Sequence, residues 1–549
     1  MACDQRLNLA KERMWKLQVE TVLENENINI YIADEIQRQR LLELPDNRRR
    51  NILLKLTSDI CAKDNGDLEE FENRLKVLKL LLSPQTTEVN INGLMTFSPV
   101  ESREDNFLKL LHEILTLAPN VQILSVVEDG IKLQEDQRIL DLLNSQTNLK
   151  SLHTLDCANL QVLYTTLAQL CSVVESLRHV NVQINYTDGL LPDLNELKSS
   201  FCRLKVFLFT VWNEEQHERT SSPSLEDRFW RLCVRELLNL EIVGRPADDP
   251  SLMHGNQRVI ELPASTSNLR HLVTRANNLG MHLAFPNVTH LNIHLLGCVD
   301  RNKINAMLQF SSQIESLILI CPQSGAVVSE FLARYGPTLK NLVIKSTWTA
   351  LRYKFEPIFS LCPGLKKLTL FNVEMMDDMQ TMKTLKELTH FEWLPPKRPY
   401  IERCATLSNI LISAPNLQRL KIQSEWFFTK DLENISNLIV EQKILQKLEL
   451  FHFDHVSDED IPACFKIDRK FEQFAAFFPV FSDLMKNAIA YCPVLIDVDV
   501  FVELNDQDVD YRVNKRCKHG VPPSKELWDD EALRLLGEKE LARFLKICS

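Results

Sequence analysis

The chain has 549 residues, 45% of them hydrophobic and 25% charged, which is typical of globular proteins and sufficient for two or three domains or one repeat array. Its net charge of −11 argues against a general nucleic-acid binder, because such proteins carry a basic footprint. Neither an apolar signal sequence nor a run of roughly 20 apolar residues able to cross a bilayer is evident. The 14 cysteines form no CxxC pair and fit small buried apolar residues of a reducing compartment. We therefore expect a cytoplasmic or nuclear protein.

Residues 1–100 predict an α-helical N-terminal module. Apolar side chains recur at helical spacing in LNLAKERMWKL (7–17) and in FENRLKVLKLLLSP (71–84). The ordinary role of such a module is to cap the exposed end of the domain that follows. The basic run at 48–50 fits a solvated helix face, with a nuclear signal or a charged docking patch as the alternatives.

The stretch LELPDNRRRNILLKL (42–56) resembles the start of an F-box at Leu44 and Pro45 and again at Ile52 and Leu53. Leucine-rich receptors of the elongin and cullin-2 type also begin with a helical region of this kind. Either resemblance implies that the N-terminal helices bind an adaptor of the Skp or elongin type, which would connect the chain to a cullin.

A proline-bearing phrase recurs from residue 118 onwards, as in APNVQILSV (118–126), FPNVTHLNI (285–293) and LCPGLKKLTL (361–370). Two residues after each proline stands an apolar residue, here called the anchor, which is followed by apolar residues three and five places later. The best-defined anchors are separated by 26, 25 and 26 residues; they are Val288, Ile314, Leu339 and Leu365. The same spacing begins without proline at Leu445, while Leu385 and Leu388 fit two registers equally well.

This spacing predicts a strand followed by a return segment in each unit, and a period of 20 to 29 residues is typical of a leucine-rich repeat. Alternate residues of a strand face opposite sides, so Leu368 and Leu370 are expected in the core. The return segments 302–313 and 406–414 have helical periodicity. Pro363 is expected to end one return helix, because proline does not continue a helix.

Residues 118–505 resemble the leucine-rich repeats of intracellular proteins, which are familiar from F-box and other ubiquitin-ligase substrate receptors. Asn372 fits the asparagine that follows the strand in this family. The resemblance implies an α/β fold, a leucine-rich repeat solenoid in which outer helices cover a curved parallel β-sheet. We predict the helical module over 1–100, the solenoid over 101–505, and a linker with a C-terminal helical cap over 506–549.

The side chains expected on the open face of the sheet are the best candidates for a function. They stand two, four and six places after each anchor and combine basic with aromatic residues, a mixture that protein-binding surfaces use. Two tryptophans stand nine places after their anchors, where packing beneath neighbouring loops is the alternative role. The candidates for binding a partner protein are Lys345, Trp348, Lys367, Phe371, Arg419, Lys421, Trp426 and Phe451.

No Walker loop, dinucleotide fingerprint, HExxH or GxSxG motif is present, so no cofactor and no catalytic residue is expected. His452, Asp454 and His455 form the densest polar cluster, which fits a solvated loop after a strand better than a zinc site. The irregular segment 451–490 leaves an enzymatic site as a third alternative.

We predict a non-enzymatic protein-interaction module that recognises the substrate of a cullin-type ubiquitin ligase. Its basic residues would select an acidic stretch of the target, and its N-terminal helices would bind the adaptor. A scaffold or regulator without a ligase is the alternative.

Overall fold

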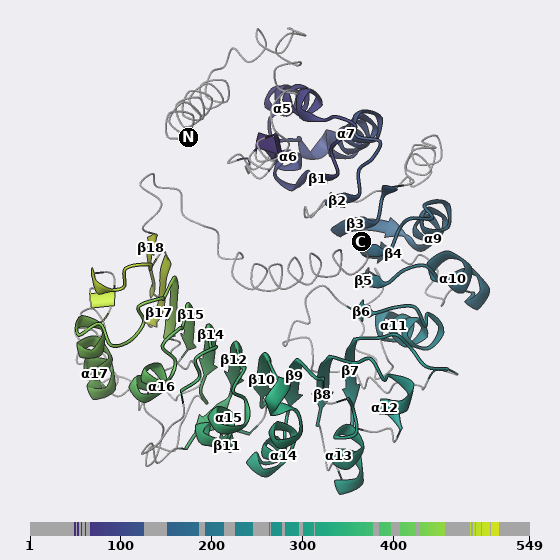
Figure 1. Cartoon of the computed structure of the whole chain (residues 1–549). Coiled ribbons are helices and arrows are strands. Elements are labelled where there is room, and N and C mark those ends of the chain that lie inside the picture. Colours follow the sequence, from purple (N-terminus) through teal and green to yellow (C-terminus); the bar gives the residue numbers. More distant parts are fainter. Residues whose placement is uncertain are drawn as a thin grey trace, which may run out of the picture. The chain divides into compact units, whose positions relative to one another are not determined.

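The computed structural model describes two compact units, Met1–Asn256 and Gln257–Ser549. The described residues are 66–125, 151–185, 193–212, 225–244, 265–276, 280–295, 300–376 except 312 and 348, 384–396, 407–423, 429–455, 497–504 and 507–514, with single residues among 49–61, 263 and 484–495. Figure 1 draws these residues as coloured ribbons.

The first unit contains a six-stranded parallel sheet whose strands neighbour one another in chain order. The strands are β1 (Glu88–Asn90), β2 (Ile123–Ser125), β3 (Thr154–Leu163), β4 (His179–Asn185), β5 (Val206–Trp212) and β6 (Ile242–Gly244). The helices within the described residues of this unit are α5 (Leu68–Leu81), α6 (Asn92–Thr96), α7 (Arg103–Leu117), α9 (Tyr164–Val173), α10 (Leu194–Phe201) and α11 (Leu225–Glu236). Strand β1 lies within the N-terminal 100 residues, so the region predicted as a helical module contributes the first strand of the sheet.

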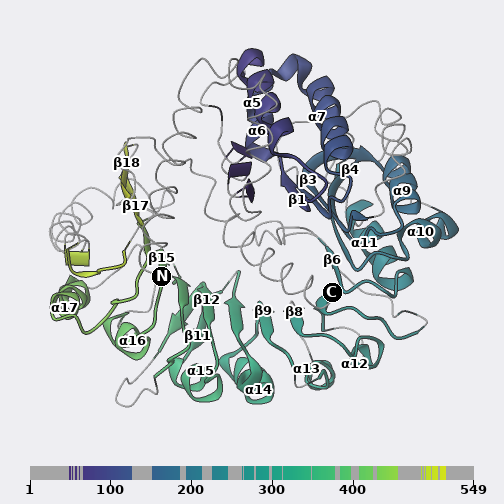
Figure 2. The same ribbon diagram turned by 45° about the horizontal axis from the view of Figure 1, so that its top comes forward.

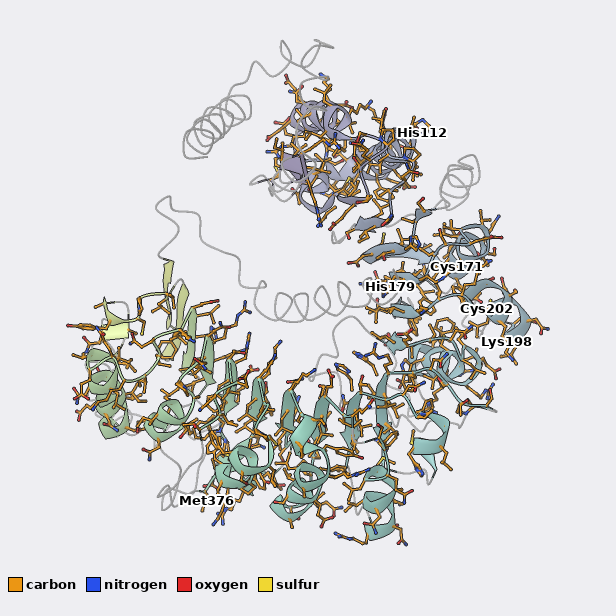
Figure 3. The ribbon with its side chains drawn as sticks, in the orientation of Figure 1. His112, Cys171, His179, Lys198, Cys202 and Met376 are labelled. Carbon is orange, nitrogen blue, oxygen red and sulfur yellow. The ribbon has the colours of Figure 1, made fainter. Side chains whose placement is uncertain are left out.

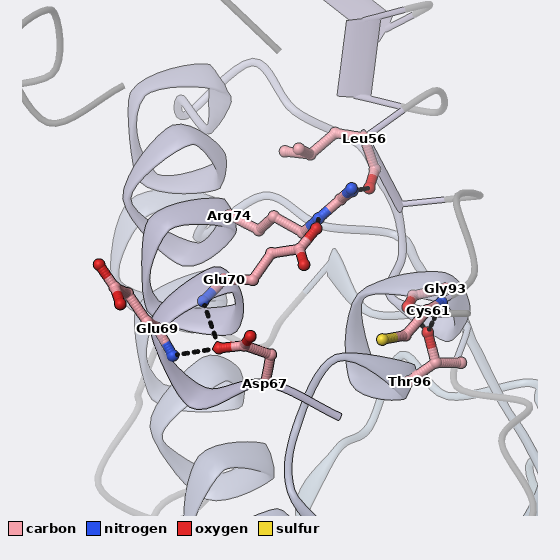
Figure 4. Close-up of polar contacts among 8 residues, drawn as sticks. All are labelled: Leu56, Cys61, Asp67, Glu69, Glu70, Arg74, Gly93 and Thr96. Carbon is pink, nitrogen blue, oxygen red and sulfur yellow. Dashed lines mark hydrogen bonds and ion pairs between the residues drawn. The ribbon is translucent and has the colours of Figure 1, made fainter. Parts of the chain in front are cut away.

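Side-chain hydrogen bonds cap helix α5 and connect it and its neighbours to other segments of the first unit. Asp67 caps α5, since its Oδ1 accepts hydrogen bonds from the backbone N–H groups of Glu69 and Glu70 at 3.1 and 3.3 Å (Figure 4). Arg74 donates from Nη1 to the carbonyl of Leu56 at 3.3 Å. Arg49 is 5% exposed and donates to Gln85 at 3.2 Å. This residue of the basic run is therefore part of the packed module, contrary to the expected solvated helix face.

The second unit contains a ten-stranded sheet in the order β18-β17-β16-β15-β14-β12-β10-β9-β8-β7. The strands are β7 (His271–Arg275), β8 (His290–His294), β9 (Ser316–Ile320), β10 (Asn341–Lys345), β12 (Lys367–Phe371), β14 (His390–Leu394), β15 (Arg419–Gln423), β16 (Leu450–His455), β17 (Asp497–Leu504) and β18 (Gln507–Asn514). Neighbours from β7 to β17 are parallel, which confirms the strands predicted from the anchors. A separate parallel pair is formed by two short strands, β11 (Leu351–Tyr353) and β13 (Val373–Met375). Along the chain, β11 follows β10 and β13 follows β12.

The return helices of the second unit lie on one side of its sheet in both views (Figures 1 and 2). They are α12 (Met281–Ala284), α13 (Arg301–Met307), α14 (Gly325–Tyr335), α15 (Phe355–Leu361), α16 (Leu407–Ser413) and α17 (Thr429–Val440). The helical periodicity at 302–313 and 406–414 is thus confirmed by α13 and α16. Along β12 the burial alternates, with Leu368 and Leu370 at most 1% exposed and their neighbours half-exposed.

The proline of each phrase occupies the second position of a tight turn. Helix α15 ends at Leu361, and the N–H of the anchor Leu365 donates to the carbonyl of Cys362 at 3.2 Å. Pro363 follows that acceptor, at the position where its fixed φ suits the turn. The equivalent bond is present without proline, for example from Leu388 to Leu385 at 3.3 Å. Leu388 is therefore the anchor of β14, and the ambiguity between the two registers is resolved.

Successive units are joined by hydrogen bonds as well as by the apolar core. The N–H groups of Lys366 and Lys367 both donate to the carbonyl of Lys340 in the preceding unit, at 2.8 and 2.9 Å. At the other end of the strand, the N–H of Asn372 donates to the carbonyl of Leu394 at 2.6 Å. Asn372 has a φ of 53°, a conformation that asparagine tolerates better than most residues. The residue that fits the family's asparagine position therefore occupies the turn after the strand.

An antiparallel hairpin forms the C-terminal edge of the second sheet. Strand β18 pairs with β17 in the opposite direction, with Asn514 in register with Asp497. A linker with a helical cap was predicted for 506–549, and this prediction is wrong for 507–514. The alternation in QDVDYRVN is that of a strand, but it lacks the leucine anchor that marks the preceding units. The predicted helical cap beyond 514 lies outside the described residues.

Candidate functional site

The open face of the second sheet is formed by side chains that stand two, four and six places after each anchor. The strand register aligns these positions into three rows that cross the sheet. The first row contains His271, His290, Ser316, Asn341, Lys367, His390 and Arg419. Parallel sheets are usually covered on both faces. Here the return helices cover one side, and many side chains of the other side are half-exposed.

Four basic side chains gather on three adjacent strands of this face, and we call them the basic patch: Lys367, His390, Arg419 and Lys421. Lys367 is in register with His390, and His390 with Arg419. Lys421 stands in the second row, where its Nζ lies 3.3 Å from Oε1 of Glu392. All four side chains are half-exposed. The lysine and arginine side chains of the patch place positive charge on this face, with Glu392 beside Lys421.

Lys345 and Phe371 stand next to each other in the third row. The Nζ of Lys345 lies 4.7 Å from the centre of the Phe371 ring, and Lys345 is 7% exposed. The cation therefore holds the aromatic ring in place and has little surface left for an acidic group. The role predicted for Lys345 as a direct contact with the target does not fit this burial, whereas Phe371 remains half-exposed on the face.

Phe451 faces the core, which corrects its predicted place on the open face. The N–H of Leu448 donates to the carbonyl of Leu445 at 3.1 Å, so Leu448 is the anchor of this unit. Phe451 then stands three places after the anchor, in register with the buried Leu420, and is 3% exposed. The reason for the error is that both Leu445 and Leu448 begin an acceptable leucine pattern.

Four other predicted residues lie outside the described part of the chain: Trp348, Trp426, Leu44 and Pro45. Of the remaining adaptor candidates, Ile52 is half-buried and Leu53 is 4% exposed. Leu53 therefore packs in the core of the first unit, and it is not placed to contact an adaptor directly.

Two stacked histidines on the open face were not predicted as a pair. The rings of His271 and His290 lie 3.9 Å apart, centre to centre, with 14° between their planes. Burial, followed by the neighbouring His290 and Arg270, lowers the pKa of His271 well below its usual value. His290 is in turn bonded at Nδ1 to the hydroxyl of Thr289 at 2.9 Å. The stacked ring of His271 is therefore neutral at ordinary pH and packs as an apolar group, despite its polar residue type.

His390 was also missed, because its strand had two possible registers. The phrases VTHLNI (288–293) and LTHFEW (388–393) repeat the same Thr-His pair after the anchor, and this repetition was the available signal. In the structure Thr389 and the Nδ1 of His390 form the same hydrogen bond as in β8, at 2.8 Å. The repeated phrase thus identifies Leu388 as the anchor.

The described residues do not assemble a recognisable centre for chemistry. Among them, no group of three or more His, Cys, Asp or Glu side chains is arranged to hold a metal ion. His452, from the predicted polar cluster, lies within β16 and is 9% exposed, so it does not belong to a solvated loop. The side chains of Asp454 and His455 lie outside the described part. No helix within the described residues is long and apolar enough to span a membrane.

Compared with known protein families and with curated proteins, the chain matches none. Among solved structures it is similar to the complex of Rad7 and Elc1 in yeast, with 12% identity, 85% of this chain and 95% of that chain covered, and a TM-score of 0.39. It is also similar to an internalin (inlF) from Listeria monocytogenes, with 14% identity, coverage of 68% and 95%, and a TM-score of 0.31. Both identities are low, and the proposals below are based on the geometry of the face.

Proposed function

We propose that the chain is a leucine-rich repeat protein that binds a partner protein on the open face of its second sheet. The single observation that carries this proposal is the basic patch on a parallel sheet whose helices lie on the other side. A sheet face that the described helices leave open provides a broad surface, which suits a protein better than a small molecule. The partner is expected to present an acidic stretch to Lys367 and Arg419.

Such a protein acts by holding its partner at a fixed position on the sheet, and it carries out no reaction of its own. Stacked units hold the strands in fixed register, so the basic side chains are positioned before the partner arrives. Charges at a partly exposed surface contribute more to the association rate and to specificity than to affinity. Half-exposed Phe371 adds an aromatic contact beside the patch.

The test compares two pairs of charge reversals in the full chain. Lys367→Glu with Arg419→Glu alters the face, whereas Arg301→Glu with Lys303→Glu makes the same change in charge on α13. Affinity capture from cells with quantitative mass spectrometry measures the bound proteins. We expect a specific partner to be lost about tenfold or more with the first pair and retained with the second. Equal capture by both variants contradicts the proposed face.

We further propose that the partner is the substrate of a cullin-type ubiquitin ligase. Support comes from the resemblance of residues 42–56 to the start of an F-box and of the repeats to those of ligase receptors. Deleting residues 1–100 is a poor test, because β1 belongs to the first sheet and Leu53 to its core. Leu44→Glu with Pro45→Ala is the sharper change.

Purified adaptors of the Skp and elongin types are then tested for binding to the full chain. Binding that is lost in the Leu44→Glu, Pro45→Ala variant supports the receptor role. If neither adaptor binds the unaltered chain, the scaffold alternative holds instead, and the binding face is unaffected by that result.

A further inference from the structure

The C-terminal hairpin directs the chain to the end of the sheet where the basic patch lies. Strand β18 runs back along β17, and its last residue, Asn514, is in register with Asp497. Asp497 is in register with Leu450, and Leu450 with Arg419. Asn514 is therefore in backbone register with the first row, to which Arg419 belongs.

The residues that follow are long enough to reach the whole patch. Neighbouring strands are about 4.8 Å apart, so the three intervals from β18 to β15 cover about 14 Å and the five intervals to β12 about 24 Å. Residues 515–524 span up to about 33 Å when extended. A segment that begins at residue 525 can therefore lie over any part of the patch.

The charges of this region alternate in a way that matches the sheet. The hairpin sequence contains Asp497, Asp499, Asp508 and Asp510, and the next residues, KRCKHGVPPS (515–524), are basic. Residues 525–536, KELWDDEALRLL, are acidic again, with Asp529 and Asp530 next to Trp528. A basic stretch thus follows the acidic hairpin, and an acidic stretch comes within reach of the basic patch.

We propose that residues 525–536 of the same chain bind the basic patch when no partner is present, with Asp529 and Asp530 facing Lys367 and Arg419. The segment has the chemistry expected of the external partner, so the two compete for one surface. This proposal builds on the proposed function, because it assigns an internal occupant to the same face. A partner must then displace the segment, which makes its capture selective for strongly acidic sequences.

The direct test places a photo-reactive benzoylphenylalanine at Trp528 of the full chain. Irradiation followed by mass spectrometry identifies the peptides that are cross-linked. We expect cross-links within one chain, to the peptides that contain β12, β14 or β15. Cross-links only to other parts of the molecule, or only between chains in proportion to concentration, overturn the proposal.

Charge reversal checks that the basic patch is responsible. Lys367→Glu with Arg419→Glu is expected to reduce the cross-link yield about fivefold, and adding Asp529→Lys with Asp530→Lys should restore it. The matched control is Arg301→Glu with Lys303→Glu on α13, which should leave the yield unchanged. A yield that does not respond to the reversal overturns the proposal. The milder pair Lys367→Gln and Arg419→Gln serves if the reversal disturbs folding.

The two proposals fail in different ways. If the cross-links are absent but partner capture still depends on Lys367 and Arg419, the internal occupant is wrong and the binding face stands. If the cross-links form as expected but no captured protein responds to the charge reversals, the external function is wrong and the internal contact stands. When both hold, Asp529→Lys with Asp530→Lys should increase partner capture several-fold.

Discussion

His179, labelled in Figure 3, lies on β4 of the first unit. The residue is 5% exposed. Burial lowers its pKa from 6.5 to about 3, and the positive charge of Lys205 adds to this effect. The protonated form is disfavoured because an apolar surrounding replaces its hydration. This histidine is therefore neutral in the folded protein at ordinary pH and behaves as a packing residue.

The lowered pKa predicts that the first unit loses stability in acid. Between pH 3 and 6.5 the unfolded chain takes up a proton that folded His179 refuses, so stability falls as the pH is lowered through this window. At pH 4.5 the loss from this residue is on the order of 2–3 kcal/mol. Urea unfolding at pH 7 and 4.5 should show a smaller acid-induced loss for His179→Leu than for the unaltered chain. The control is His112→Gln, at an exposed position on α7 (Figure 3). An equal acid-induced loss for His179→Leu and the unaltered chain contradicts the assignment.

The cysteines differ in reactivity for the same physical reason. Cys171 and Cys233 are buried, and burial raises the pKa of both thiols, while Cys202 is exposed. Because the thiolate is the reactive form, iodoacetamide should label Cys202 in the folded protein and Cys171 and Cys233 only after unfolding. Peptide mass spectrometry at successive times measures the three rates. Labelling of Cys171 as fast as Cys202 would show that its site is open.

At the scale of the element, the turn before each strand limits how closely two units can stack. Gly336 lies in the turn before β10, and a Cβ added there would stand 2.5 Å from the carbonyl oxygen of Leu361 in the next unit. Gly364 occupies the following turn, where the same addition would meet its nearest atom at 3.8 Å. Only the first of these glycines is required by the close approach of the backbones.

This contrast provides a matched pair of substitutions. Gly336→Ala should destabilise the second unit by about 1–3 kcal/mol, because the backbone of the neighbouring unit has to move. Gly364→Ala should change the stability by less than about 0.5 kcal/mol, since no contact is strained. The midpoints of urea unfolding decide between them. Similar midpoints for both variants would mean that the backbone at Leu361 moves away from the added methyl group without loss of stability.

The elements that the sequence predicted well are those with a clear anchor. The strand after Leu365 and the helices at 301–307 and 407–413 lie where periodicity placed them. The errors arose where the sequence offered two possible anchors, as at Leu445 and Leu448, or no anchor, as in 507–514. The burial of Lys345 depends on the Phe371 ring of the next strand, and a residue's own repeat does not reveal that partner.

At the scale of the whole molecule, the chain divides into two units with separate sheets. One continuous solenoid was predicted over 101–505, whereas the paired strands begin with β1 at Glu88 and extend to β18, which ends at Asn514. Each unit has its own buried core, and the aromatic cluster around Phe207 and Phe229 belongs wholly to the first. This organisation predicts two cooperative unfolding steps.

Gly336→Ala serves as the probe for these two steps. Hydrogen exchange of the full chain in increasing urea should show earlier opening of β9, β10 and β12 in the second unit. The strands β4 and β5 of the first unit should exchange as in the unaltered chain. If the protection of both units falls together, the chain unfolds as one cooperative body.

The sequence alone determined the repeating unit, because the side of a strand on which a residue lies is fixed by its spacing from the anchor. It also determined which residue types reach the open face, including Lys367, Phe371 and Arg419. The tertiary structure decided which of the side chains on the open face are exposed to a partner. Cross-strand neighbours come from units about 25 residues away, and they place Lys345 against Phe371 and Lys421 beside Glu392. The turn at Leu445 made Leu448 the anchor, which directs Phe451 into the core.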